Sequence, residues 1–285
     1  MKLLRYGPSG SERPGLLDAQ GRIRDLSAHV ARLDADALSP DSLARLREVD
    51  PQSLAIVDGH PRLGIPFVGV SKFIGVGLNY SDHAAESNMP VPKEPILFTK
   101  ATSCLCGPND DIIEPQESTK LDWEVELGIV IGTKAQYVSE NHALDYVAGY
   151  CVVNDVSERD FQLERGSQWD RGKGCDTFGP VGPWLVTTDE VADPQSLALW
   201  LAVNGESRQR GSTRTMIFGC AHLVSYISRF MTLLPGDIIT TGTPPGVGMA
   251  MKPPRFLKPG DIVTLGIDGL GEQRQRVVAW SGNRT

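Results

Sequence analysis

The alternation of polar and apolar residues is clearest in LDWEVELGIVIG, which spans residues 121–132. Glu124 and Glu126 are two residues apart, and Val125 and Leu127 alternate with them. Side chains at positions i and i+2 of a β-strand share one face, so we expect both carboxylates on one side and the aliphatic groups on the other. Two carboxylates on a buried strand would repel each other, and a divalent cation between them would relieve this. Taken alone, the stretch favours a solvated strand face, so the metal interpretation depends on further acids and a base.

Other apolar runs of strand length predict a β-rich protein. We expect strands at residues 2–6, 15–18, 22–26, 73–78, 95–100, 148–155, 183–186, 197–203 and 236–242, and two more before residue 279. Asn204-Gly205 is a strong signal for a hairpin turn.

Helices are expected at fewer places. Ser39 followed by Pro40 predicts a helix start, because serine suits the N-cap and proline the first turn. The apolar spacing over residues 215–231 predicts the clearest helix of the chain. A shorter helix is expected at residues 158–165 and a helical stretch at 141–146.

The chain divides into two predicted domains. Residues 1–66 resemble a small N-terminal α/β module that ends in a linker rich in proline and glycine. Residues 67–285 carry the candidate chemistry and form the predicted main domain.

Composition narrows the functional classes. The 285 residues have a formal net charge of -7 and no basic stripe, which argues against nucleic acid as a partner. No apolar run approaches the length of a membrane span, and the first residues lack the apolar core of a signal peptide. Five cysteines without a zinc-type pair indicate free thiols in a reducing cytoplasm. We therefore expect a cytoplasmic protein without a nucleic-acid or membrane partner.

A third acid and a possible base strengthen the metal interpretation. Asp155 lies at the end of the predicted strand 148–155, where a side chain can emerge into a cleft. With Glu124 and Glu126 it would offer three carboxylate oxygens, which suits Mg²⁺ or Mn²⁺ better than zinc. His83 and Glu86 are three apart on a predicted short helix, so the carboxylate can orient the imidazole as a base. The alternative is a chance pair on a surface helix.

Several cationic and polar residues could surround a bound anion. Lys173 lies between two glycines in the predicted loop 166–179, which is long enough to be a lid. Arg159 and Gln162 would share a helix face, and the rigid turn at Thr243 could bind a carboxylate. Lys100, at a strand end, could face a carboxylate cluster. Each of these residues could instead be an ordinary surface or turn residue.

In combination, these stretches resemble the fumarylacetoacetate hydrolase family. The segments GVGLNYSDHAAE, PILFTK, DWEVELGIVIG, GYCVVNDVSERDFQ, GKGCDTFGP and PGDIITTGTPPGVG follow the order of the family between residues 73 and 248. The resemblance implies an α+β, β-rich fold whose mixed sheets roll around the active site, and it suggests a homodimer. It implies Glu124, Glu126 and Asp155 as ligands of Mg²⁺ or Mn²⁺.

The resemblance also implies catalytic roles. His83 and Glu86 correspond to the water-activating dyad, and Lys173 to a contact with the substrate carboxylate or an oxyanion. Arg159, Gln162 and Thr243 correspond to substrate contacts.

Family members act on 2,4-diketo acids, oxaloacetate or related 2-oxo acids. The front segment RYGPSGSERPGLLDAQGRIRDLSAH resembles bacterial members that hydrolyse 2,4-diketo-3-deoxy-L-rhamnonate or L-fuconate to pyruvate and a hydroxy acid such as L-lactate, in L-rhamnose catabolism. Such sequences are also often labelled ureidoglycolate lyase. We therefore expect a metal-dependent hydrolase that acts on carbon–carbon bonds in ketonic substances. The alternatives are an oxaloacetate decarboxylase, an acylpyruvate hydrolase or isomerase, a ureidoglycolate lyase, and a non-enzymatic binding module stabilised by a cation.

Overall fold

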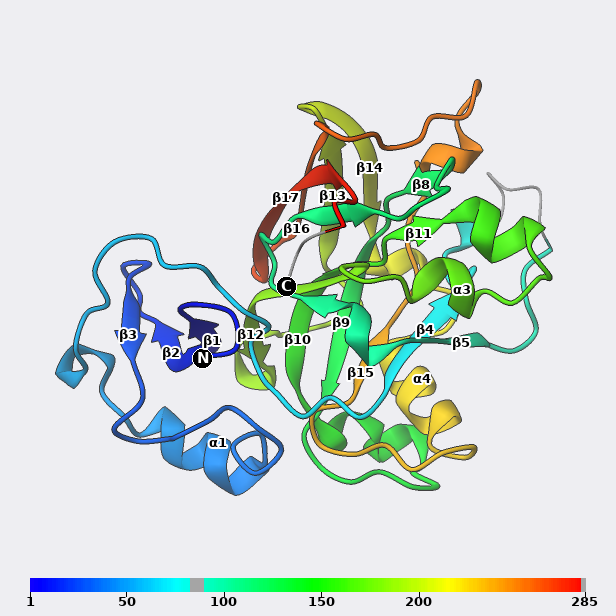
Figure 1. Cartoon of the computed structure of the whole chain (residues 1–285). Helices are drawn as coiled ribbons and strands as arrows, with labels where there is room; N and C mark the ends of the chain where they lie inside the picture. The colour runs from blue at the N-terminus through cyan, green and yellow to red at the C-terminus, as the bar shows by residue number, and fades with distance from the viewer. Residues whose placement is uncertain (83–89, 283–285) are drawn as a thin grey trace.

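A ten-stranded mixed sheet runs through the whole molecule (Figure 1). The computed structural model describes residues 1–82 and 90–282. Nine strands follow one another in the spatial order β3 (Ile23–Asp25), β2 (Arg13–Leu17), β1 (Lys2–Tyr6), β12 (Gly179–Thr187), β10 (Val147–Asn154), β9 (Val125–Ile131), β15 (Ile238–Thr240), β4 (Phe73–Gly77) and β5 (Ile96–Lys100), and β6 (Leu105–Cys106) pairs with β12.

A second sheet lies beside the first and consists mostly of strands from the last third of the chain. Its spatial order is β14 (Glu206–Ser212), β13 (Ala198–Val203), β16 (Ile262–Ile267), β17 (Gly271–Ala279) and β7 (Ile112–Glu114). A separate two-stranded ribbon pairs β8 (Leu121–Asp122) with β11 (Ser157–Glu158). Asn204 and Gly205 connect β13 to β14 with positive φ angles of 53° and 79°, which confirms the predicted hairpin turn.

Helical segments within the described residues are short. The α-helices there are α1 (Pro40–Arg47), α3 (Asp170–Lys173) and α4 (Cys220–Ile227), and the other helical turns are Pro51–Ser53, Thr102–Cys104, Glu140–Tyr146, Asp160–Glu164, Thr188–Glu190, Thr213–Thr215 and Gly248–Ala250. The side chain of Ser39 accepts a hydrogen bond from the backbone N–H of Ser42, so the predicted N-cap of α1 is confirmed. Among the described residues, no helix combines the length and apolar composition needed to cross a membrane.

The helices near the site differ from the sequence predictions. The predicted helix 215–231 is much shorter, because Ile217 donates its backbone N–H to the carbonyl of Asn79 and Gly219 is the N-cap residue of α4. The predicted helix 158–165 is a single π-helical turn, because Glu158 belongs to β11. The predicted loop 166–179 contains α3, which carries Lys173.

The N-terminal strands continue the large sheet. Leu3 of β1 pairs with Leu185 of β12, and both leucines are buried. Figure 1 shows β1–β3 and α1 at one side of the molecule and the remaining strands at the other. The division into domains at residues 66 and 67 stays a prediction, whereas the predicted β-rich α+β fold is confirmed.

Candidate active site

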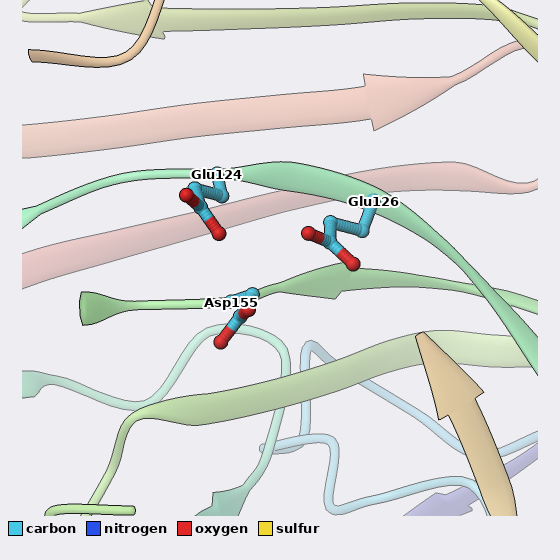
Figure 2. Close-up of side chains that lie close together, drawn as sticks. All are labelled: Glu124, Glu126 and Asp155. Carbon is cyan, nitrogen blue, oxygen red and sulfur yellow. The ribbon is translucent and has the colours of Figure 1, made fainter. Parts of the chain in front are cut away.

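Three acidic side chains from two neighbouring strands converge on one point. Glu124 immediately precedes β9, Glu126 is in its second position, and Asp155 follows the last residue of β10. The backbone N–H of Asp155 donates to the carbonyl of Glu124 at 2.9 Å, which sets the two acids opposite each other. One carboxylate oxygen of each acid lies within 4.8 Å of the others. Figure 2 shows Glu124 and Glu126 on the same side of their strand, directed towards Asp155.

Two buried lysines contact this acidic trio. Lys173 Nζ donates to Glu124 Oε2 and to Asp155 Oδ2, both at 2.6 Å. Lys100 Nζ donates to Asp155 Oδ1 at 2.6 Å and also to the carbonyl of Lys173. Of the two interpretations of Lys100, the structure therefore favours contact with the carboxylate cluster over a solvated strand end.

A buried arginine joins the trio to two further polar groups. Arg159 Nη2 donates to Glu124 Oε1 at 2.6 Å, and its Nη1 donates to Gln162 Oε1 at 2.9 Å. Its Nε donates to Asp122 Oδ2 at 2.9 Å. The guanidinium is thus held in place by three protein acceptors.

Glu126 is the acid of the trio whose negative charge is least compensated by neighbouring groups. Burial raises the pKa of Glu126 well above its ordinary value, and the charges of Asp155 and Glu124 act in the same direction. Burial also raises the pKa of Glu124, but the charges of Lys173 and Arg159 outweigh burial and bring this pKa down to about 2. Glu126 is held in position by the hydroxyl of Thr240 and the backbone N–H of Gly242.

The arrangement fits a divalent cation. The three convergent donors are all carboxylate oxygens, which Mg²⁺ and Mn²⁺ prefer, and the acids are almost completely buried. Asp122, Glu124 and Asp155 pair with three buried cations (Lys100, Arg159 and Lys173), and Glu126 adds a further buried carboxylate to the trio. A cation next to Glu126 would compensate the excess negative charge.

The acidic trio lies in the wall of a cavity of about 510 Å³. Lys173, Arg159, Gln162 and Thr243 also line the cavity. The rest of the wall is largely apolar and includes Val76, Leu78, Phe98, Leu163, Trp169, Met249, Met251 and Pro254. A small anion could therefore bind at the charged end while its hydrophobic part contacts the apolar wall.

The structure brings together seven of the residues singled out from the sequence. Glu124, Glu126, Asp155, Lys173, Arg159, Gln162 and Thr243 all border this one cavity. The Thr243 hydroxyl already donates to the carbonyl of Val125 at 2.9 Å and accepts from Gln209 Nε2 at 2.8 Å. The proposed dyad, His83 and Glu86, lies outside the described residues.

The roles of Asp122 and of the apolar cavity wall were not predicted from the sequence. Asp122 precedes Glu124 by two residues, so the same alternation that singled out the glutamates could have included it. Met249, Met251 and Pro254 had no such signal, since they lie in and after the short turn Gly248–Ala250, which borders the cavity only because of the fold.

The family model described as fumarylacetoacetate (FAA) hydrolase C-terminal matches residues 72–278, most of the chain. The chain belongs to the fumarylacetoacetate hydrolase family. A relative in Burkholderia cenocepacia (strain HI2424), provisionally named a hydrolase, is 67% identical over 277 residues, which cover 97% of this chain and 98% of the relative.

Solved structures of the family include both hydrolases and an isomerase. The fumarylacetoacetate hydrolase of Exiguobacterium antarcticum has a TM-score of 0.87 and 38% identity, with 98% of this chain and 100% of that chain covered. The maleylpyruvate hydrolase of Sphingobium sp. SYK-6, in complex with manganese(II) and pyruvate, has a TM-score of 0.82 and 29% identity, covering 99% and 100%. The 5-carboxymethyl-2-hydroxymuconate delta-isomerase of Mycobacterium smegmatis has a TM-score of 0.77 and 32% identity, covering 99% and 100%.

Proposed function

We propose that this protein is a divalent-metal-dependent hydrolase that cleaves the C3–C4 bond of a 2,4-diketo acid and releases pyruvate. The observation that carries the proposal is the convergence of Glu124, Glu126 and Asp155 beside Lys173 at the charged end of a mostly apolar cavity. The maleylpyruvate hydrolase with manganese(II) and pyruvate supports the same chemistry in a relative.

The side chains of this protein would divide the work of catalysis. A divalent cation held by Glu124, Glu126 and Asp155 would act as a Lewis acid that makes the enolate of pyruvate a better leaving group. Lys173 would offset negative charge that develops on the substrate, because its ammonium lies buried at the charged end of the cavity. Arg159 and Gln162 would orient the 2-oxo acid.

Water activation is assigned to the dyad proposed from the sequence resemblance. His83, oriented by Glu86, would take a proton from water, and the resulting hydroxide would add to the C4 carbonyl. The C3–C4 bond would then break, with its electron pair going to C3, and a proton would complete pyruvate. The second product would be the carboxylic acid that contains C4.

The specific substrate proposed is 2,4-diketo-3-deoxy-L-rhamnonate, or its L-fuconate counterpart, which would give pyruvate and a hydroxy acid such as L-lactate. This assignment rests on the resemblance of the N-terminal segment and places the reaction in L-rhamnose catabolism in the cytoplasm. The wider class of acylpyruvates belongs in the same test, as do oxaloacetate and ureidoglycolate. A homodimer is also proposed, and light scattering in solution would test it.

An isomerase is the second candidate. The similarity to the delta-isomerase of Mycobacterium smegmatis favours it, and the same charged end of the cavity could stabilise an enolate without attack by water. An isomerase would move a double bond and release no pyruvate.

The test is a pyruvate-release assay with Mg²⁺ or Mn²⁺ and with a chelator. We expect turnover of at least one 2,4-diketo acid that chelator abolishes and either metal restores, and we expect Glu126→Gln to weaken metal binding and activity. A His83→Ala variant as active as the parent would remove the dyad from the mechanism. Metal-induced thermal stabilisation without turnover of any substrate in the panel would instead support the cation-stabilised binding module.

A further inference from the structure

Asp122 is a fully buried carboxylate outside the acidic trio, and it contacts two separate parts of the cavity. Its Oδ2 accepts hydrogen bonds from Arg159 Nε at 2.9 Å and from the backbone N–H of Met249 at 3.1 Å. Its Oδ1 accepts from the backbone N–H groups of Gly248, at 2.7 Å, and Trp123, at 2.9 Å. Both oxygens of this one side chain are therefore shared between different segments.

One of these segments is the charged end of the cavity. Arg159 reaches Glu124 and Gln162 through its two terminal nitrogens while Asp122 holds its Nε. A guanidinium is planar, so fixing one nitrogen restricts where the other two can point. Asp122 thereby controls the orientation of Arg159 against Glu124 without lining the cavity itself.

The other segment is the apolar wall formed by Met249, Ala250 and Met251. The Asp122 carboxylate accepts hydrogen bonds from the successive backbone N–H groups of Gly248 and Met249. The indole N–H of the neighbouring Trp123 donates to the carbonyl of Gly246 at 3.1 Å. A Cβ atom on Gly248 would lie 2.7 Å from Asp122 Oδ1 and 2.0 Å from the carbonyl oxygen of Arg255, so only glycine permits this close approach. The pair Asp122-Trp123 thus holds the wall at three points.

We infer that Asp122 is a positioning residue that determines the substrate specificity of this site. It holds the wall at Met249 close to the charged end, so that between two acylpyruvates without hydroxyl groups the cavity favours the one with the larger apolar acyl group. The inference rests on the proposed function only for the identity of the ligand. The attachment of the wall to Asp122 can be tested without any turnover.

The test variant is Asp122→Asn, which keeps the shape but replaces one oxygen with an NH₂ group. Each oxygen of Asp122 accepts hydrogen bonds from two donors. Whichever oxygen is replaced, the new NH₂ group therefore faces two N–H groups and cannot accept from them. The matched control is Asp237→Asn. Asp237 is also fully buried and accepts from the backbone N–H groups of Lys72 and Leu234 and from the Lys72 ammonium, away from the cavity.

Hydrogen exchange tests the attachment of the wall. In the parent we expect the amides of Gly248 and Met249 to be protected, although the Met249 side chain is 40% exposed. In Asp122→Asn they should exchange about tenfold faster or more, and in Asp237→Asn they should keep the parental rate. Unprotected amides in the parent would overturn the inference even if the Asp122 variant failed to fold.

Selectivity tests the functional consequence. We expect Asp122→Asn to raise KM for benzoylpyruvate about tenfold with a smaller change in kcat, and to reduce the preference for benzoylpyruvate over acetylpyruvate by a similar factor. Met249→Ala should reduce the same preference, and Asp237→Asn should preserve it. An equal loss of kcat/KM for both compounds in Asp122→Asn would show a merely structural role.

The two proposals can fail separately. If the parent releases no pyruvate from either compound, the proposed hydrolysis is wrong for acylpyruvates. The preference for benzoylpyruvate over acetylpyruvate can then be measured as the ratio of their calorimetric affinities for the Mn²⁺-loaded protein. Equal affinities in the parent, or a preference that Asp122→Asn leaves intact, would overturn the specificity role.

Discussion

Asp155 accepts a hydrogen bond from a different lysine on each of its carboxylate oxygens. Lys173 and Lys100 are both almost inaccessible to solvent, and burial of two ammonium groups is tolerated because each has a carboxylate partner. Burial lowers the pKa of Lys173, but the charges of Asp155 and Glu124 outweigh it, so the pKa lies above its ordinary value. Lys173 therefore remains charged at the pH of the cell.

We expect catalysis to depend on the positive charge of Lys173. In Lys173→Met, Glu124 and Asp155 lose a shared cation, and the charge that develops on the substrate is no longer offset. We expect kcat/KM for the best 2,4-diketo acid to fall about 100-fold. Steady-state pyruvate release measures this change.

Lys120→Met is the control for that substitution. Lys120 pairs with Glu164 and lies outside the cavity, so its loss should leave kcat/KM unchanged. Activity of Lys173→Met within threefold of the parent would show that the ammonium serves no catalytic purpose.

Helix α3 contacts strand β5 at the cavity. Asp170 Oδ1 accepts from the backbone N–H of Thr99 at 3.0 Å, and the carbonyl at the other end of α3 accepts from Lys100. Trp169, the N-cap residue of α3, packs its ring on Phe98 with centroids 5.6 Å apart. A helix of four residues has little stability by itself, so these contacts fix where Lys173 lies.

Gly77 of β4 lies against Trp169, the residue that precedes α3. A Cβ on Gly77 would lie 2.5 Å from Trp169 Cζ3, so Gly77→Ala must displace the indole. We expect KM to rise several-fold while the free energy of unfolding falls by only about 1 kcal/mol. Substrate kinetics and urea denaturation measure the two quantities.

A glycine in the second sheet provides the matched control. A Cβ on Gly266 would lie 2.9 Å from Trp200 Nε1, and neither residue lines the cavity. Gly266→Ala should therefore cost similar stability without changing KM. A parental KM in Gly77→Ala would exclude Trp169 as a substrate-contacting wall.

Strands and convergent acids were predictable from the sequence, whereas helix extents were not. Glu124 and Glu126 share a face because alternation is a local property of a strand. The helical spacing at 215–231 was equally regular, but tertiary pairing of Ile217 with Asn79 prevents a helix there. The contact between Asp122 and Met249 joins residues more than a hundred positions apart, and no local pattern encodes it.

The N-terminal strands β1–β3 cover one edge of the large sheet that carries the acidic trio. β1 lies between β2 and β12, and Leu3 and Leu4 are completely buried. Arg62 also pairs with Asp110, with Nε 2.7 Å from Oδ1. Residues 1–66 thus contribute to the stability of the rest, whether or not they count as a domain of their own.

The corresponding prediction concerns a truncated chain of residues 67–285. Removing β1 leaves β12 with an unpaired edge and exposes apolar side chains, so we expect aggregation or a Tm at least about 10 °C lower than that of the full chain. Differential scanning calorimetry and light scattering measure both. A truncated protein that is monodisperse and melts within a few degrees of the parent would establish residues 67–285 as an independent folding unit.

The position of Trp169 gives this protein a built-in optical reporter. Indole emission depends on the polarity and packing around the ring, and this ring borders the cavity and lies on the helix that carries Lys173. The other tryptophans add background emission: Trp123, Trp184, Trp200 and Trp280. The spectrum of a Trp169→Phe variant measures this background, so that it can be subtracted. Compounds that enter the cavity without reacting would thus be detectable by a change in fluorescence, so a chemical library could be screened before any turnover is observed.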